Sequence, residues 1–160
     1  FNSLGAVPAA VRTGAVSVDH LEVMTDEDIE GLKSAPTIAT ALPSCSFFLG
    51  LDYAPMKKMM QNDIAVSLAS DYNPGSTPSG NLNFVFALAC IKMRMTPGQA
   101  LNALSINAAH ALNLENVVGS IQTGKKADLL LFKSIDHLAA IPYHFGENKV
   151  SKVMLDGYFQ

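Results

Sequence analysis

Three short apolar runs, each ending in polar side chains, constrain the fold of this chain most strongly. They occupy residues 15–18, 37–42 and 65–69, and a segment with helical character separates each run from the next. Short apolar runs without alternation are typical of strands buried on both faces, and their alternation with helices is typical of parallel sheets. The sequence therefore predicts an α/β chain in which three parallel strands are covered by helices.

Capping signals delimit the predicted helices. Thr25, followed by three acidic residues, predicts a helix over residues 26–34 that ends before a proline. A second helix is expected around residues 54–62, and an apolar, buried one over residues 82–95. Thr96 then combines with a following Pro and Gln to predict a capped helix that continues to about residue 113.

The character of the chain changes after residue 115. Residues 119–132 alternate as in a β-hairpin with its turn at Thr123-Gly124, and residues 149–160 read as two strands joined by an Asp-Gly turn. We therefore divide the chain into an α/β body over residues 1–115 and a small antiparallel segment over residues 116–160.

Composition narrows the classes of partner. Hydrophobic residues make up 49% of the chain and charged residues 16%, with a net charge of −3 and no basic stripe that would suit nucleic acid or an anionic membrane. The longest apolar stretch, 82–91, is about half of the roughly 20 residues that a membrane span needs. The N-terminal residues lack the pattern of a signal peptide, and the two cysteines form no C-x-x-C pair. We expect a cytoplasmic protein with reduced thiols and a small-molecule substrate, and no nucleic-acid or membrane partner.

Asp71 is the sharpest candidate for chemistry. It follows the third apolar run and precedes a loop rich in Pro, Gly, Ser and Asn. A carboxylate at the carboxyl end of a parallel strand can bind a metal ion or act as a general base. The alternative is that Asp71 only caps its loop through an Asx-turn. The residues by themselves leave both interpretations open.

His20 follows the first apolar run in the same way, so it is either a catalytic residue or a hydrogen-bonded structural histidine. The loop from Asn73 through Gly75 to Ser76 offers backbone N–H groups that could bracket a carboxylate, or it is an ordinary tight turn. His110, within a helix, is a weaker candidate, as are the two histidines near the C-terminus. The chain contains no H-x-H or H-E-x-x-H pair, so its residues do not form a conventional metal site by themselves.

Several motifs occur together between residue 15 and the C-terminus. The segments INAAHAL and GSIQTGKKADL resemble the amidohydrolase superfamily in general. More specific are the segments VDHL, LPSCSFFLG, SDYNPGS and PYHFG. Through these, the chain resembles the imidazolonepropionase family of that superfamily.

The resemblance implies the C-terminal part of a distorted TIM-type (β/α)8 barrel of a metal-dependent hydrolase, with a small β-sandwich segment at the C-terminus. The three predicted strands would be the sixth, seventh and eighth of the barrel. One zinc or iron ion is implied, with Asp71 as one ligand and most other ligands outside this chain. Asp71 and His20 would be catalytic, and Asn73, Gly75 and Ser76 would bind substrate.

The implied reaction is hydrolysis of the cyclic amide 4-imidazolone-5-propanoate to N-formimidoyl-L-glutamate in histidine degradation, by an enzyme that is a homodimer when full length. Because one metal ligand is present, we expect the 160-residue chain to be inactive alone. Two alternatives remain open. One is another amidohydrolase, such as a guanine or cytosine deaminase, and the other is a non-catalytic piece that pairs with a partner chain.

Overall fold

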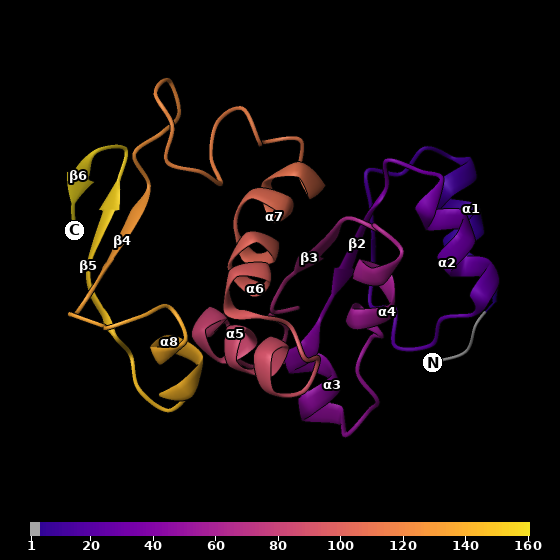
Figure 1. Ribbon diagram of the computed structural model, residues 1–160, viewed down its shortest axis with the longest axis horizontal. Coiled ribbons are helices and arrows are strands. Elements are labelled where there is room, and N and C mark those ends of the chain that lie inside the picture. Colours follow the sequence, from indigo (N-terminus) through magenta and orange to yellow (C-terminus); the bar gives the residue numbers. More distant parts are fainter. Residues whose placement is uncertain (1–3) are drawn as a thin grey trace.

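The computed structural model describes residues 4–160; residues 1–3, with which the expected α/β body begins, lie outside the described part. Figure 1 shows a parallel sheet flanked by helices, with an antiparallel sheet at the side of the molecule away from the N-terminus. In chain order the elements are α1 (Ala6–Arg12), β1 (Ser17–Asp19), α2 (Asp26–Lys33), β2 (Ile38–Ala41), α3 (Pro43–Leu49), α4 (Met56–Gln61), β3 (Val66–Leu68), α5 (Leu82–Ile91), α6 (Pro97–Leu104), α7 (Ile106–Ala111), β4 (Leu129–Phe132), α8 (Ala140–Tyr143), β5 (Val150–Leu155) and β6 (Tyr158–Phe159).

The parallel sheet is confirmed, in the order β1-β2-β3. Each strand pairs in parallel with its neighbour, and all of β2 and β3 is buried, as the apolar runs predict. The strands are shorter than their runs, and β1 begins two residues later than expected. A buried hydrogen bond between the hydroxyls of Thr40 and Ser67, 2.7 Å apart, joins β2 to β3 and satisfies both polar groups within the apolar sheet.

Helices pack next to both edge strands of this sheet. In Figure 1, α1 and α2 lie together next to β1, while α6 and α7 lie next to β3. The caps of α2 and α6 are confirmed as full capping boxes, Thr25 with Asp28 and Thr96 with Gln99. The side-chain amide of Asn107 in α7 donates a 2.8 Å hydrogen bond to the carbonyl of Val66, which ties α7 to β3.

Two helix predictions were wrong in detail, and α3 was not predicted. Pro43, read as the end of a strand, is the first residue of α3, where its missing N–H costs no intrahelical bond. The apolar helix α5 ends at Ile91, four residues early. The last predicted helix is two helices, because Ser105 has φ −122° and ψ −90° and interrupts it between α6 and α7.

The C-terminal residues form the expected antiparallel sheet, in the order β4-β5-β6. The turn at Asp156-Gly157 is confirmed between β5 and β6. The predicted hairpin over residues 119–132 is wrong: the chain turns near Thr123-Gly124, but β4 pairs with the distant β5, and the described residues 119–128 contain no strand. The predicted β-sandwich needs a second sheet packed against β4-β5-β6, and this part of the prediction stays a prediction.

A single cluster of buried side chains joins the sheet to its helices. It includes Leu32 of α2, Met59 of α4 and Val85 of α5, all almost fully buried. Cys45 and Cys90 are free thiols, as expected. Within residues 4–160, no helix is long and apolar enough to cross a membrane.

Candidate active site

The carboxyl ends of the parallel strands bring separate segments of the chain to one edge of the sheet. Asp19 at the end of β1 pairs with Thr40, and Ala41 at the end of β2 pairs with Leu68 at the end of β3. The residues that follow each strand therefore begin at nearly the same level. In parallel α/β folds, this is the edge at which ligands bind.

Asp71 lies three residues beyond β3 and is half-buried. Its Oδ2 accepts a 2.9 Å hydrogen bond from the Ser76 hydroxyl, which itself accepts one of 2.7 Å from the side-chain amide of Asn73. The backbone φ of Asp71 is +57°, a conformation that is uncommon for residues other than glycine. The carboxylate is thus held from one side by its own loop.

The loop after Asp71 is organised by Asn73. The Oδ1 atom of Asn73 accepts hydrogen bonds from the N–H groups of Gly75 and Ser76, at 2.9 and 2.8 Å, and its backbone pairs with Thr77. The Asx-turn that the sequence allowed for Asp71 is therefore made by Asn73. The two N–H groups that were candidates to bracket a carboxylate already donate within this loop.

His20 follows β1 directly, and both His20 and Leu21 have positive φ, +74° and +75°. The His20 Nδ1 atom lies 3.5 Å from Oε1 of Glu22, whose side chain is only 4% exposed. The same Oε1 accepts a 3.2 Å hydrogen bond from the Ser46 hydroxyl. His20 and Glu22 also line a hollow of about 170 Å³ bounded by residues of α1 and β1.

The first residues of α3 connect the segments that follow β1 and β3. The Ser44 hydroxyl donates a 2.8 Å hydrogen bond to the carbonyl of Ser70, while Ser46 reaches Glu22. Cys45 lies between them and is fully buried. Burial raises the pKa of the Cys45 thiol, and the carboxylates of Asp71 and Glu22 raise it further, opposing a hydrogen bond with Ser76 that lowers it.

Sequence reasoning missed Glu22 and the Ser44–Ser46 segment. The Ser44–Ser46 segment carried a signal, because PSCS follows the second apolar run as Asp71 follows the third. Pro43 marks the end of the apolar run, but it is also the first residue of the helix that contains these serines.

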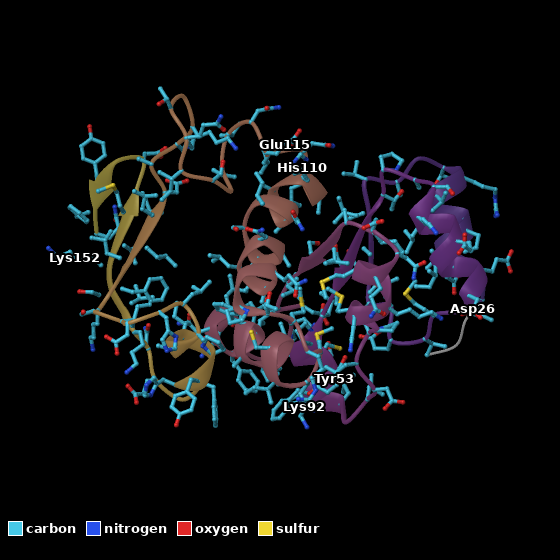
Figure 2. The ribbon with its side chains drawn as sticks, in the orientation of Figure 1. Asp26, Tyr53, Lys92, His110, Glu115 and Lys152 are labelled. Carbon is cyan, nitrogen blue, oxygen red and sulfur yellow. The ribbon has the colours of Figure 1, made fainter. Side chains whose placement is uncertain are left out.

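Two of the other three histidines pair with glutamates outside this set of residues. The Nδ1 atom of His110, at the end of α7, lies 3.8 Å from Oε2 of Glu115, and Figure 2 shows the two residues side by side. The Nδ1 atom of His144 lies 3.3 Å from Oε1 of Glu147. Both pairs lie in segments that do not follow a parallel strand.

The described residues 4–160 contain no group of three or more His, Cys, Asp or Glu side chains that could hold a metal ion. Asp71 nevertheless fits one ligand position, since its carboxylate lies at the carboxyl edge with a hydroxyl fixing one oxygen. The donors within residues 4–160 therefore do not complete a metal site by themselves.

Comparison with known proteins places this arrangement in a family. Residues 5–159 match the amidohydrolase family. The chain belongs to the amidohydrolase family. This amidohydrolase chain is 52% identical over 157 residues to an imidazolonepropionase of Flavobacterium johnsoniae, 51% identical over 157 residues to one of Christiangramia forsetii and 42% identical over 158 residues to one of Bacillus cytotoxicus. Each alignment covers 98% of this amidohydrolase chain but only 37–38% of the relative, so the chain spans under two fifths of the length of these proteins.

Solved structures of other enzymes share the fold. An adenosine deaminase from Xanthomonas campestris with bound zinc superposes with a TM-score of 0.80 and 19% identity, covering 89% of this chain and 36% of that one. Escherichia coli guanine deaminase gives a TM-score of 0.75 and 15% identity, covering 89% of this chain and 38% of that one. The expected fold class, an α/β chain forming part of an amidohydrolase barrel, is confirmed.

Proposed function

We propose that this chain is the C-terminal part of an imidazolonepropionase, which hydrolyses 4-imidazolone-5-propanoate to N-formimidoyl-L-glutamate. The observation that carries the proposal is the position of Asp71, fixed by Ser76 at the carboxyl edge of the sheet, in a chain about half identical to imidazolonepropionases. The reaction is a hydrolysis: the oxygen of water bonds to the ring carbonyl carbon, and the ring C–N bond breaks.

Asp71 is proposed as one ligand of a zinc or iron ion whose other ligands belong to the part of the enzyme outside this chain. A related fold with bound zinc supports a metal of this kind, and the carboxylate suits either ion. When bound, such an ion supplies a water molecule that loses its proton near neutral pH.

The residues of this chain would then move protons and hold the substrate. Asp71 accepts the proton of the attacking water and returns it to the leaving ring nitrogen. His20, which follows β1 at the same edge of the sheet, donates a hydrogen bond to the carbonyl oxygen as negative charge develops there. Asn73, Gly75 and Ser76 bind substrate or product, which requires Asn73 to release the N–H groups that it now engages.

Other features of the whole enzyme are part of the same proposal. Residues 1–115 belong to its barrel and residues 116–160 to one part of a small β-sandwich. The enzyme would be a cytoplasmic homodimer that acts on a small molecule and binds neither nucleic acid nor membrane. The net charge of −3, without a basic stripe, supports this choice of partner.

The decisive experiment compares this chain alone with the chain restored to the length of its relatives. Metal content and imidazolonepropionate hydrolysis are measured for both proteins. We expect about one metal ion per chain and turnover only in the restored protein, because three-ligand groups are absent from residues 4–160. Turnover by the 160-residue chain itself would refute the assignment of the missing ligands to another segment.

Two substitutions in the restored protein separate the proposed roles. Asp71→Asn should lower both metal content and kcat, the latter by about a thousandfold, because ligand charge and proton acceptor are lost together. His20→Ala should leave metal content unchanged and lower kcat by about a hundredfold, because a donor to the developing oxyanion is lost. Equal loss of metal in the two variants would contradict this division.

A deaminase is the second candidate, favoured by the fold shared with adenosine and guanine deaminases. Asp71 and His20 would keep similar roles, and an exocyclic amino group would leave in place of a ring nitrogen. Assays of the restored protein with adenosine, guanine, cytosine and imidazolonepropionate decide between them. Ammonia release from a base, without hydrolysis of imidazolonepropionate, would favour the deaminase.

A non-catalytic assembly piece is the remaining candidate from a different class. Large apolar side chains at the end of α3, including Phe47 and Phe48, are about half exposed in the isolated chain. Such surface favours association with another polypeptide. Size-exclusion chromatography of the 160-residue chain tests this candidate, since a monomer with one cooperative unfolding transition would count against it.

A further inference from the structure

We infer that Glu22 is a positioning residue for His20, holding the imidazole ring and the hydrogen on its Nδ1 so that Nε2 is presented to the substrate. The inference rests on the proposed function for the role of His20, while the contact itself rests on the geometry. The Glu22 side chain is 4% exposed, and its Oε1 lies 3.5 Å from His20 Nδ1.

A carboxylate in such a place needs specific partners, because burying an unpaired charge costs several kcal/mol or more. Ser46 supplies one partner, since its hydroxyl donates to Oε1 at 3.2 Å. The His20 ring supplies the second, and its Nδ1 is the atom that faces the carboxylate. A hydrogen on Nδ1 is the arrangement in which ring and carboxylate attract each other.

The His20–Glu22 contact is held by α3 and by the buried core, both outside the loop after β1. Ser46 belongs to α3 and so approaches Glu22 from the segment after β2. Leu21, between His20 and Glu22, is 6% exposed and packs in the core. Anchoring Leu21 in the core keeps both flanking side chains at the edge of the sheet.

The backbone supports a functional interpretation of this turn. Positive φ at His20 and at Leu21 costs on the order of 1–3 kcal/mol per residue, and such strain is concentrated at functional sites. With this backbone conformation, the side chains of His20 and Glu22 lie within ion-pair distance of each other. A distance of 3.5 Å is longer than a hydrogen bond, and hydrogen bonds of catalytic groups often shorten when substrate binds.

Glu22 acts through His20 rather than on the substrate. Its Oε1 faces Ser46 and His20 together, and little of the side chain is exposed. A buried carboxylate on the second nitrogen of a functional histidine fixes its tautomer and ring orientation, as in other enzymes in which a carboxylate orients a histidine. Loss of Glu22 should therefore affect turnover more than substrate affinity.

The first test reads the hydrogen position directly. The restored, zinc-loaded enzyme is prepared with 15N-labelled histidines. The NMR chemical shifts of the His20 ring nitrogens report which nitrogen carries the hydrogen. These signals are assigned to His20 because they are absent in His20→Gln. We expect Nδ1–H in the unmodified enzyme and a shift towards Nε2–H in Glu22→Gln. An Nε2–H ring in the unmodified enzyme, or a tautomer unaffected by Glu22→Gln, would overturn the inference.

Kinetics supply the second test. Glu22→Gln should lower kcat about tenfold and leave KM within about twofold, as expected for an interaction that matters in the transition state. In the His20→Ala background the same substitution should cost nothing further, because its effect passes through the ring. An equal loss of kcat from Glu22→Gln with His20 present and with His20→Ala would mean that the role of Glu22 is purely structural.

Glu115 provides the matched control, since its Oε2 lies 3.8 Å from Nδ1 of His110 outside the site. Glu115→Gln should move only the His110 signals and leave kcat unchanged; a tenfold loss of kcat would mean that any such substitution harms the enzyme. If Glu22→Gln fails to fold, Glu22→Asp tests the same contact by shortening the side chain so that the carboxylate no longer reaches Nδ1, and an unchanged His20 tautomer would overturn the inference. The tautomer of His20 can be measured without substrate. A restored enzyme that does not hydrolyse imidazolonepropionate would therefore refute the proposed function, while the His20–Glu22 contact could still be tested.

Discussion

Replacement of Gly119 by alanine should destabilise the protein through a backbone approach that the structure makes explicit. Gly119 has φ +89°, and a Cβ added there would lie 2.7 Å from the Cβ of Ala109, 3.0 Å from the Cα of Ile106 and 3.1 Å from the carbonyl oxygen of Ser105. These atoms belong to α7 and to the residue that precedes it. Gly119 is thus the point at which the segment after α7 passes directly over that helix.

Gly124 provides a matched control for this substitution. Its φ is +91°, nearly the same as that of Gly119, but a Cβ added there would meet no atom within 4 Å. Positive φ costs an alanine about 1–2 kcal/mol at either position, offset at both by about 0.4–1 kcal/mol from the reduced freedom of the unfolded chain. Overpacking adds about 1–3 kcal/mol at Gly119 alone, so Gly119→Ala should be less stable than Gly124→Ala by that amount.

The assay is urea-induced equilibrium unfolding of the restored protein and of each variant, with the free energies compared at equal m-values. Ala109→Gly in the Gly119→Ala background removes the nearest atom, so part of the stability should return, with a coupling energy of about 1 kcal/mol or more. Equal destabilisation at Gly119 and Gly124, or strictly additive effects of the paired substitutions, would refute the argument from close approach.

Three further outcomes follow from single contacts. Thr25→Ala should destabilise the protein by about 1–2 kcal/mol and Thr96→Ala by about 0.5–1 kcal/mol, measured by urea unfolding, because only the first cap leaves a buried carboxylate without its hydroxyl donor. Burial raises the pKa of the Cys45 and Cys90 thiols, so we expect neither thiol to react with iodoacetamide at pH 7 in the folded protein. Because the folded protein holds these thiol protons more tightly than the unfolded chain, the resulting contribution to stability is complete below about pH 8.5, the ordinary thiol pKa. That contribution should be lost as the pH rises further. Ser76→Ala removes the hydroxyl that fixes the Asp71 carboxylate and should weaken metal binding by about tenfold in a metal titration; unchanged affinity would mean that Ser76 has no part in orienting the ligand.

The parallel sheet was predictable because its strands are apolar on both faces. The runs at 15–18, 37–42 and 65–69 each contain a strand, in the order and direction expected. Helix starts were predictable where a side-chain cap marked them, as at Thr25 and Thr96. Each of these signals is local, so a single sequence is enough to read it.

The failed predictions depended on contacts between distant residues. The alternating segment after Gly119 looks like a hairpin, but β4 finds its partner in β5 instead. The break at Ser105 has no Gly or Pro to mark it, and the alanines and leucines of residues 101–112 favour a continuous helix. The close approach of Gly119 to α7 is a contact of the same kind, since it joins residues about ten positions apart and no local pattern announces it.

The candidate site divides in the same way between local and distant signals. His20 and Asp71 could be proposed from sequence because each lies two residues beyond an apolar run. Glu22 was missed because its contact requires two consecutive residues with positive φ, which a leucine at position 21 argues against. The burial of Leu21 and the hydroxyl of Ser46 offset that local cost, and both depend on the folded chain. A residue that orients a catalytic group is therefore hardest to read from sequence where tertiary packing overrides the preference of its own backbone.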